Sequence, residues 1–207
     1  MTNLRNRIVF AALAVLLGAC ASKGPTQAHF DFGPLPQQAA AAAPAAAAAP
    51  AVGSIIVADV SGPASLDTER MQYRLLYADA RQSRPYAYNQ WTATPLQLMT
   101  QRLKARIAQA GVKVLSTTDA ATGAMLLRTE LDDFAQNFDT ATASHGTISL
   151  RASVFRAHKL VDQKTFSRSG PAGSADAQGG AQALAAASDA IAADLLTWLG
   201  TLNITKE

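Results

Sequence analysis

The sequence predicts an α+β fold in which two long amphipathic helices pack on one face of a mostly antiparallel sheet. Apolar and polar residues alternate in segments 125–131 and 148–154, which is typical of half-buried strands. Apolar residues recur every three or four positions in segments 95–110 and 184–202, which is typical of helices that bury one side. The later strands follow one another with short links, and such links favour antiparallel pairing.

The first twenty residues form a targeting signal. Two arginines precede an unbroken apolar run over residues 8–17, and small residues follow it. This is the layout of a secretory signal peptide, and the run is shorter than the ~20 apolar residues that a membrane span needs. Residues 17–20, Leu-Gly-Ala-Cys, resemble the bacterial lipobox. We therefore predict a signal peptide over residues 1–19 and lipidation of Cys20, the only cysteine in the chain.

Lipidation of Cys20 would hold the mature chain on a bilayer, because each buried methylene of an acyl chain contributes roughly 0.8 kcal/mol. Ala21 follows where lipoproteins of the inner membrane usually carry Asp, which favours the outer membrane. We expect a periplasmic domain on that anchor. Removal of the signal takes away two arginines and no acids, so the net charge of +3 becomes 3 − 2 = +1. This balance gives no indication of a nucleic-acid partner.

An Ala/Pro-rich segment over residues 34–52 is either a loop within the domain or a linker. The choice depends on residues 28–33, where two phenylalanines alternate with polar neighbours as in a short half-buried strand. If these residues join the sheet, the lipidated tether is only residues 20–27. A single domain then covers residues 28–207.

The first long helix has clear boundaries. Thr94 is a suitable N-cap, Pro95 suits the first turn, and Gln97 lies three residues after the cap. Gly111 ends the helix. Between these limits the pattern places Arg106 on the face that meets solvent.

The second long helix follows a loop over residues 169–180 that is rich in Gly, Ser and Ala. In this helix Asp189 and Asp194 lie off the apolar stripe. Four further strands complete the prediction, over residues 53–60, 71–77, 112–115 and, more weakly, 161–168.

No motif for catalysis, metal binding or cofactor binding emerges. The histidines, His29, His145 and His158, lie in no metal-binding spacing, and phosphate-gripping loops, dinucleotide fingerprints and serine elbows are absent. Acids cluster over residues 130–133, and we interpret them as the solvent-facing side of a strand. We therefore predict a protein that is not an enzyme.

Aromatic residues gather in one stretch that contains all four tyrosines and Trp91. Aromatic side chains with a polar tip favour partly wet binding surfaces, but they also fill cores. We predict Tyr86, Tyr88 and Trp91 as partner contacts. The alternative is that Tyr73, Tyr77 and Trp91 belong to the core.

These features together resemble one family, the ABC-type transport auxiliary lipoproteins of the PqiC-like kind. The resemblance rests on hydrophobic patterns and spans nearly the whole mature chain. It is carried by the lipobox, by Phe-Asp-Phe-Gly-Pro at 30–34, by Tyr-Asn-Gln-Trp-Thr-Ala-Thr-Pro at 88–95, by Leu-Asp-Asp-Phe at 131–134 and by Trp-Leu at 198–199.

The resemblance implies a non-catalytic docking or scaffold subunit on the outer membrane. Such a subunit works with an MCE-type protein, an ABC permease and an ATPase to move lipid across the periplasm, and some members resemble ring-forming homo-oligomers. An alternative resemblance is to outer-membrane lipoproteins that activate peptidoglycan synthases. A strand at residues 28–33 would favour the transport function. If these residues form no strand, the Ala/Pro-rich segment becomes part of a long tether, which would favour the activator function. A periplasmic hydrolase would need a pocket that joins a histidine to the acids.

Overall fold

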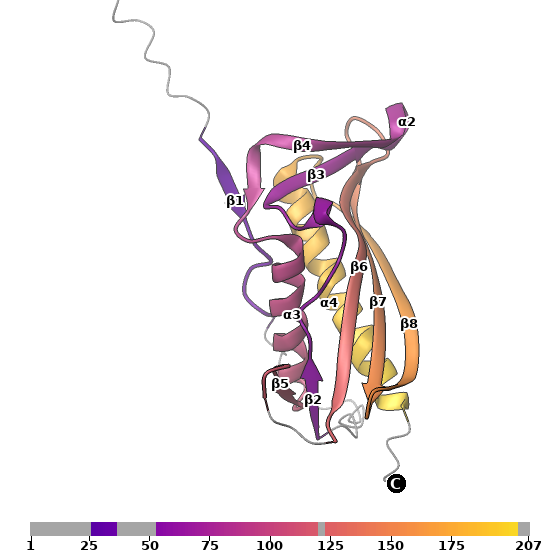
Figure 1. The fold of residues 1–207 in the computed structure, drawn as a ribbon. Helices are drawn as coiled ribbons and strands as arrows, with labels where there is room; N and C mark the ends of the chain where they lie inside the picture. The colour runs from indigo at the N-terminus through magenta and orange to yellow at the C-terminus, as the bar shows by residue number, and fades with distance from the viewer. Residues whose placement is uncertain (1–25, 37–52, 120–122, 203–207) are drawn as a thin grey trace, which may run out of the picture.

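The computed structural model describes residues 26–36, 53–119 and 123–202. These residues share one eight-stranded sheet, and two long helices lie side by side on one of its faces (Figure 1). The α+β class is as predicted. The elements are β1 (Ala28–Phe30), β2 (Ser54–Val57), β3 (Arg70–Leu75), α2 (Leu76–Asp79), β4 (Ala80–Trp91), α3 (Pro95–Gln109), β5 (Lys113–Leu115), β6 (Met125–Phe138), β7 (Ser144–Arg156), β8 (Lys159–Pro171) and α4 (Ala177–Thr201).

The sheet is mixed, so the prediction of a mostly antiparallel sheet is wrong. β6 pairs antiparallel with β7 but parallel with both β2 and β3. β1 is parallel to β4, and β2 is parallel to β5. Two neighbouring strands can be parallel only if the chain crosses back between them. Between β2 and β5, for example, α3 returns the chain to the end of the sheet at which β2 begins, so β5 runs in the same direction as β2. Only the β3–β4, β6–β7 and β7–β8 pairs of the described residues are antiparallel.

The helices also differ from the prediction, because the short helix α2 makes a third. It replaces the end of the strand predicted over residues 71–77, so β3 stops at Leu75. Tyr77, which one of the two interpretations placed in the core, is exposed, whereas Met71 is buried. The next segment forms β4, a strand that the sequence analysis did not include.

Residues 28–30 join the sheet as a short edge strand. Ala28 lies opposite Asn89 and Phe30 lies opposite Trp91. This is the arrangement that the sequence analysis connected with transport. The part of the Ala/Pro tract over residues 37–52 lies outside the described residues.

The core lies between the inner face of the sheet and the two long helices. Ile148, Leu150, Ala152 and Val154 of β7 all point inward, as their alternation predicted. α4 has the length and apolar composition of a membrane span, but half of that stretch is buried within the fold. Burial of this kind is typical of the core helix of a globular domain.

Candidate functional site: the N-terminal clasp

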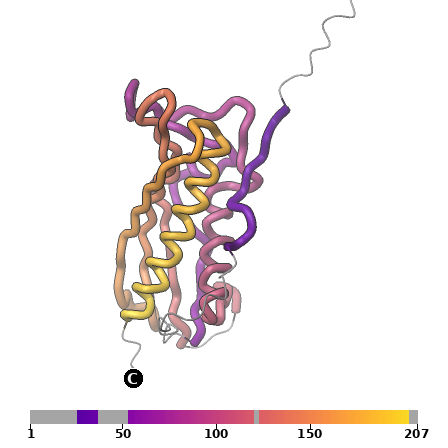
Figure 2. The backbone as a smooth tube through the Cα atoms, turned by 180° about the vertical axis from the view of Figure 1, so that it is seen from behind, coloured from indigo at the N-terminus to yellow at the C-terminus, as the bar shows by residue number. Residues whose placement is uncertain are grey.

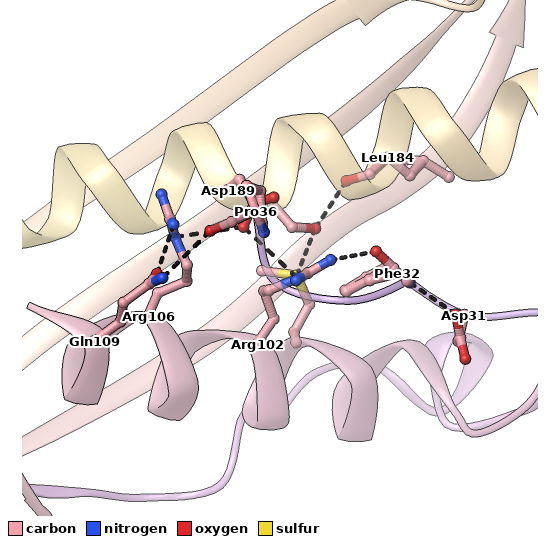
Figure 3. A network of polar contacts seen from close by, with 11 residues as sticks. Asp31, Phe32, Pro36, Arg102, Arg106, Gln109, Leu184 and Asp189 are labelled. Carbon is pink, nitrogen blue, oxygen red and sulfur yellow. Dashed lines mark hydrogen bonds and ion pairs between the residues drawn. The ribbon is translucent and has the colours of Figure 1, made fainter. Parts of the chain in front are cut away.

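The chain turns sharply after β1 and enters the space beside α3 (Figures 1 and 3). Asp31 Oδ1 accepts a hydrogen bond of 2.7 Å from the backbone N–H of Gly33. Gly33 has a φ of 65°, a conformation that glycine adopts without strain. The turn places Phe32 in the core, where its ring lies 5.9 Å from that of Trp91 and 6.0 Å from that of Phe134.

Side chains of α3 hold this segment by its backbone carbonyls. The Arg102 guanidinium donates to the carbonyl of Phe32 and lies 5.6 Å from the centre of the same ring. Gln109 Nε2 donates to the carbonyl of Pro36 at 3.2 Å. Arg106 Nη1 donates in turn to Gln109 Oε1 at 2.8 Å. Two side chains of α3 therefore bind the segment at the two ends of a five-residue stretch, and Arg106 holds one of them in place.

Asp189 of α4 supplies the opposite charge (Figure 3). Its Oδ1 lies 3.6 Å from Arg102 Nε and 3.4 Å from Arg106 Nε. The side chain of Arg102 is only 4% exposed, that of Arg106 18% and that of Asp189 17%. Water therefore screens the attraction between them weakly. Neither Nε makes a well-aligned hydrogen bond, so the attraction between the helices is mainly ionic.

We call Phe32, Pro36, Arg102, Arg106, Gln109 and Asp189 the N-terminal clasp. It joins α3, α4 and the segment that follows β1. The sequence analysis missed it, because Arg106 was expected to face solvent and Asp189 was placed off the buried stripe. One signal was available: Arg102 and Arg106 are four residues apart and therefore share one face of α3.

The clasp holds a structural contact rather than a ligand. The cavity beside Phe32 and Arg102 has a volume of about 200 Å³, below the ~300–1,000 Å³ of typical ligand pockets. The Arg102 guanidinium beside it already contacts the carbonyl of Phe32 and the carboxylate of Asp189. By holding the residues just after β1, the clasp fixes the position of β1. It thereby fixes where the chain before β1 leaves the domain.

The predicted site residues have different environments. Cys20 lies outside the described residues, so its lipidation stays a prediction. Trp91 is 1% exposed, so it is a core residue that no surface partner can reach in this structure. Tyr88 is 53% exposed on β4. Tyr86 is half-buried, and its hydroxyl donates to Gln136 Oε1 at 2.9 Å.

Gln136 connects β4, β7 and α4. Its Nε2 donates to Ser144 Oγ at 2.8 Å and to the carbonyl of Asp176 at 3.0 Å. α4 comes so close that a Cβ on Gly180 would lie 2.0 Å from Gln136 Oε1. Burial raises the pKa of Tyr86 above its ordinary value of 10.0, and the neighbouring Tyr73 and Asp176 add to this.

Two of the three acids over residues 130–133 form ion pairs with arginines of neighbouring strands. Glu130 pairs with Arg151, and Asp133 lies 2.9 Å from Arg74. The pocket of about 610 Å³ beside His158 has no acid in its lining. Within the described residues, no three His, Cys, Asp or Glu side chains lie close enough together to hold a metal ion.

Comparison with known proteins places the chain in a family. A solved structure of a DUF330 protein from Xanthomonas campestris has a TM-score of 0.64 and 17% identity, with 86% of this chain and 92% of that chain covered. A second solved structure, described as an uncharacterized protein, has a TM-score of 0.64 and 13% identity over 84% and 99% of the two chains. No curated protein matches the sequence. The family model for the ABC-type transport auxiliary lipoprotein component matches residues 34–195, most of the chain. The chain therefore belongs to the ABC-type transport auxiliary lipoprotein family.

Proposed function

We propose that this protein is an outer-membrane-anchored, non-catalytic docking or scaffold subunit of an ABC/MCE-type intermembrane lipid transport system. Its partners would be an MCE-type protein, an ABC permease and an ATPase. Family membership supports the transport role. The N-terminal clasp is the observation that carries the finer proposal, together with the lipid anchor predicted at Cys20.

A docking subunit must present its surface at a defined distance from the membrane. β1 and the clasp hold the chain from Ala28 onward, so only residues 20–27 remain as a tether. Eight fully extended residues span at most about 26–29 Å. This short reach supports a subunit held close beneath the outer membrane.

The alternative of a peptidoglycan synthase activator relies on a long tether. Such a protein would use the Ala/Pro tract to extend its reach from the membrane. In this chain the tract follows β1, which is already paired with β4. The position of β1 therefore favours transport over the activator.

A non-catalytic role agrees with the arrangement of the titratable groups. His145 Nδ1 lies 2.8 Å from Asp139 Oδ2, whereas Asp133 and Glu130 pair with Arg74 and Arg151 instead. The energy for transport would come from ATP hydrolysis in the partner ATPase.

Site-specific photocrosslinking in cells would test the proposal. A photoreactive residue at Tyr88, exposed on β4, should give an adduct with the MCE-type protein. The matched control is the same residue at Val161, which is also exposed but lies on β8 at the far end of the sheet. The proposal fails if position 88 gives no such adduct while the protein fractionates with the outer membrane. Cys20→Ser should release the protein from the membrane, and retention there would rule out the lipid anchor.

A further inference from the structure

The short helix α2 projects from one end of the sheet and carries two neighbouring apolar side chains that the fold leaves uncovered (Figure 1). Leu76 is 37% exposed and Tyr77 is 54% exposed. Arg81 follows on β4 with a side chain that is 94% exposed and whose Nε lies 3.5 Å from Asp79 Oδ1. An apolar tip flanked by cationic side chains is typical of segments that lie in a membrane interface.

The charge around α2 fits a surface rich in phosphate. From Leu76 to Trp91 the chain has the cations Arg81 and Arg84 and one acid, Asp79, and a second acid, Asp139, follows the end of β6 beside α2. The Arg84 guanidinium is held by Gln82 rather than by a carboxylate. Arg81, with its 94% exposed side chain, is therefore the cation at the α2 end that anionic headgroups can reach.

The chain also leaves the sheet toward the same end. Because β1 runs parallel to β4, the residues before Ala28 lie on the side of β4 that precedes Asn89, near Tyr88. Figures 1 and 2 show the start of β1 and α2 at one end of the molecule, opposite the end of α4. The anchor at Cys20 would draw this end toward the bilayer.

The tether is shorter than the domain, so the anchor would hold only the α2 end of the domain close to the bilayer. The tether of residues 20–27 spans at most about 26–29 Å. β7 alone has thirteen residues and spans about 43 Å, from the α2 end of the sheet to the turn before β8. The opposite end of the domain can therefore stay clear of the bilayer while the α2 end meets it.

We propose that α2 is a second membrane contact, with Leu76 and Tyr77 in the headgroup region of the bilayer that holds the lipid anchor and Arg81 at the lipid phosphates. This inference rests on the anchor of the proposed function. Tyrosine is favoured at membrane interfaces, because its ring is apolar and its hydroxyl stays hydrated. Two apolar side chains would bind a bilayer only weakly by themselves. Next to an acyl anchor the contact is intramolecular, so it orients the domain rather than recruiting it.

Tryptophan fluorescence in vesicles that contain brominated lipids would test this contact. The full lipidated chain with Tyr77→Trp is reconstituted in vesicles of phosphatidylethanolamine and phosphatidylglycerol, with bromine on the acyl chains. The matched control is Leu160→Trp, because Leu160 is also 54% exposed but lies beside the turn at the far end. The native Trp91 and Trp198 are buried and give a constant background.

An interfacial side chain lies about 5–10 Å into the headgroup boundary, so we expect brominated lipid to reduce the emission of the Tyr77→Trp residue about twofold. Leu160→Trp should keep its emission. No quenching at position 77 would overturn the inference and would indicate a protein occupant at α2. Equal quenching at both positions would also overturn it, because the domain would then have no fixed orientation.

Mass spectrometry of Cys20 in the same sample separates the two proposals. A lipidated, membrane-bound protein with an unquenched Tyr77→Trp overturns only the α2 contact. A protein without lipid on Cys20 overturns the anchor, and the α2 contact with it.

Discussion

Replacement of Asp189 by Asn should destabilise the domain strongly. The substitution keeps the size of the side chain but removes the charge that faces Arg102 Nε at 3.6 Å and Arg106 Nε at 3.4 Å. Arg102 is 4% exposed and cannot turn to water without leaving the carbonyl of Phe32. Removing one partner of a buried ion pair costs ~3–5 kcal/mol. We expect about 3 kcal/mol, at the low end of this range, because Arg106 and Asp189 keep some exposure.

Urea unfolding of the mature protein measures this cost. With an m-value of ~2 kcal/mol/M, a loss of about 3 kcal/mol lowers the midpoint by about 1.5 M without changing the slope. The matched control is Asp194→Asn on the same helix. Asp194 makes two hydrogen bonds of 2.6 Å with Arg168, but that pair is exposed to water. An exposed pair contributes little, so the control should lower the midpoint far less.

Two results would refute this reasoning. If Asp189→Asn and Asp194→Asn lower the midpoint equally, burial does not strengthen the ionic contact between the helices. If Asp189→Asn leaves the midpoint unchanged, the arginines are stabilised by other groups.

The second variant Arg102→Met removes the bond to Phe32, and it should increase hydrogen exchange of the backbone amides after β1.

Three further predictions concern α4 and its neighbours. Asp176→Ala removes the N-cap of α4 and should cost about 1 kcal/mol in urea unfolding at pH 7. Hydrogen bonds from the first amides of α4 and a nearby serine hold the pKa of Asp176 below 3.8, so its contribution should persist above pH 3.8 and disappear as the pH falls through the lower folded value. Tyr86→Phe should cost about 1 kcal/mol at neutral pH through loss of the bond to Gln136. Because burial raises the pKa of Tyr86 above 10.0, the wild type should lose stability as the pH rises past 10.0, a loss that the variant lacks. Gly180→Ala should lower the melting temperature, because its Cβ would clash with Gln136 Oε1, whereas Gly200→Ala, with open space around it, should raise stability by about 0.5 kcal/mol.

The elements that local periodicity describes were predictable. β7 alternates inward and outward along its length, and α3 begins at the predicted capping box of Thr94 and Gln97. Each of these signals depends only on residues that lie a few positions apart in the sequence, within one or two helical turns or strand repeats. Two alternating phenylalanines indicated a short strand within residues 28–33, and β1 forms over residues 28–30, with Phe32 beyond its end.

The pairing of the strands could not be predicted in the same way. β2 and β6 are parallel neighbours although more than sixty residues separate them, and no local pattern records that distance. β4 has little alternation to detect, because most of it runs along the projecting hairpin toward α2 and only its end at Trp91 is buried. The aromatic stretch was therefore open to two interpretations, a partner surface or a part of the core, and Trp91 belongs to the core.

The candidate site shows most clearly where the pattern of a single helix fails. An amphipathic analysis assigns residues off the apolar stripe to solvent, but that holds only for a helix with no neighbour beside it. α3 and α4 lie side by side on the sheet, so the flank of each stripe faces the other helix. Arg102 and Arg106 occupy one flank and Asp189 the other, and opposite charges there neutralise one another in a place that water hardly reaches. Opposite charges on the flanks of two predicted helices are therefore a sign that these helices pack together, and the same arginines hold the segment that follows β1.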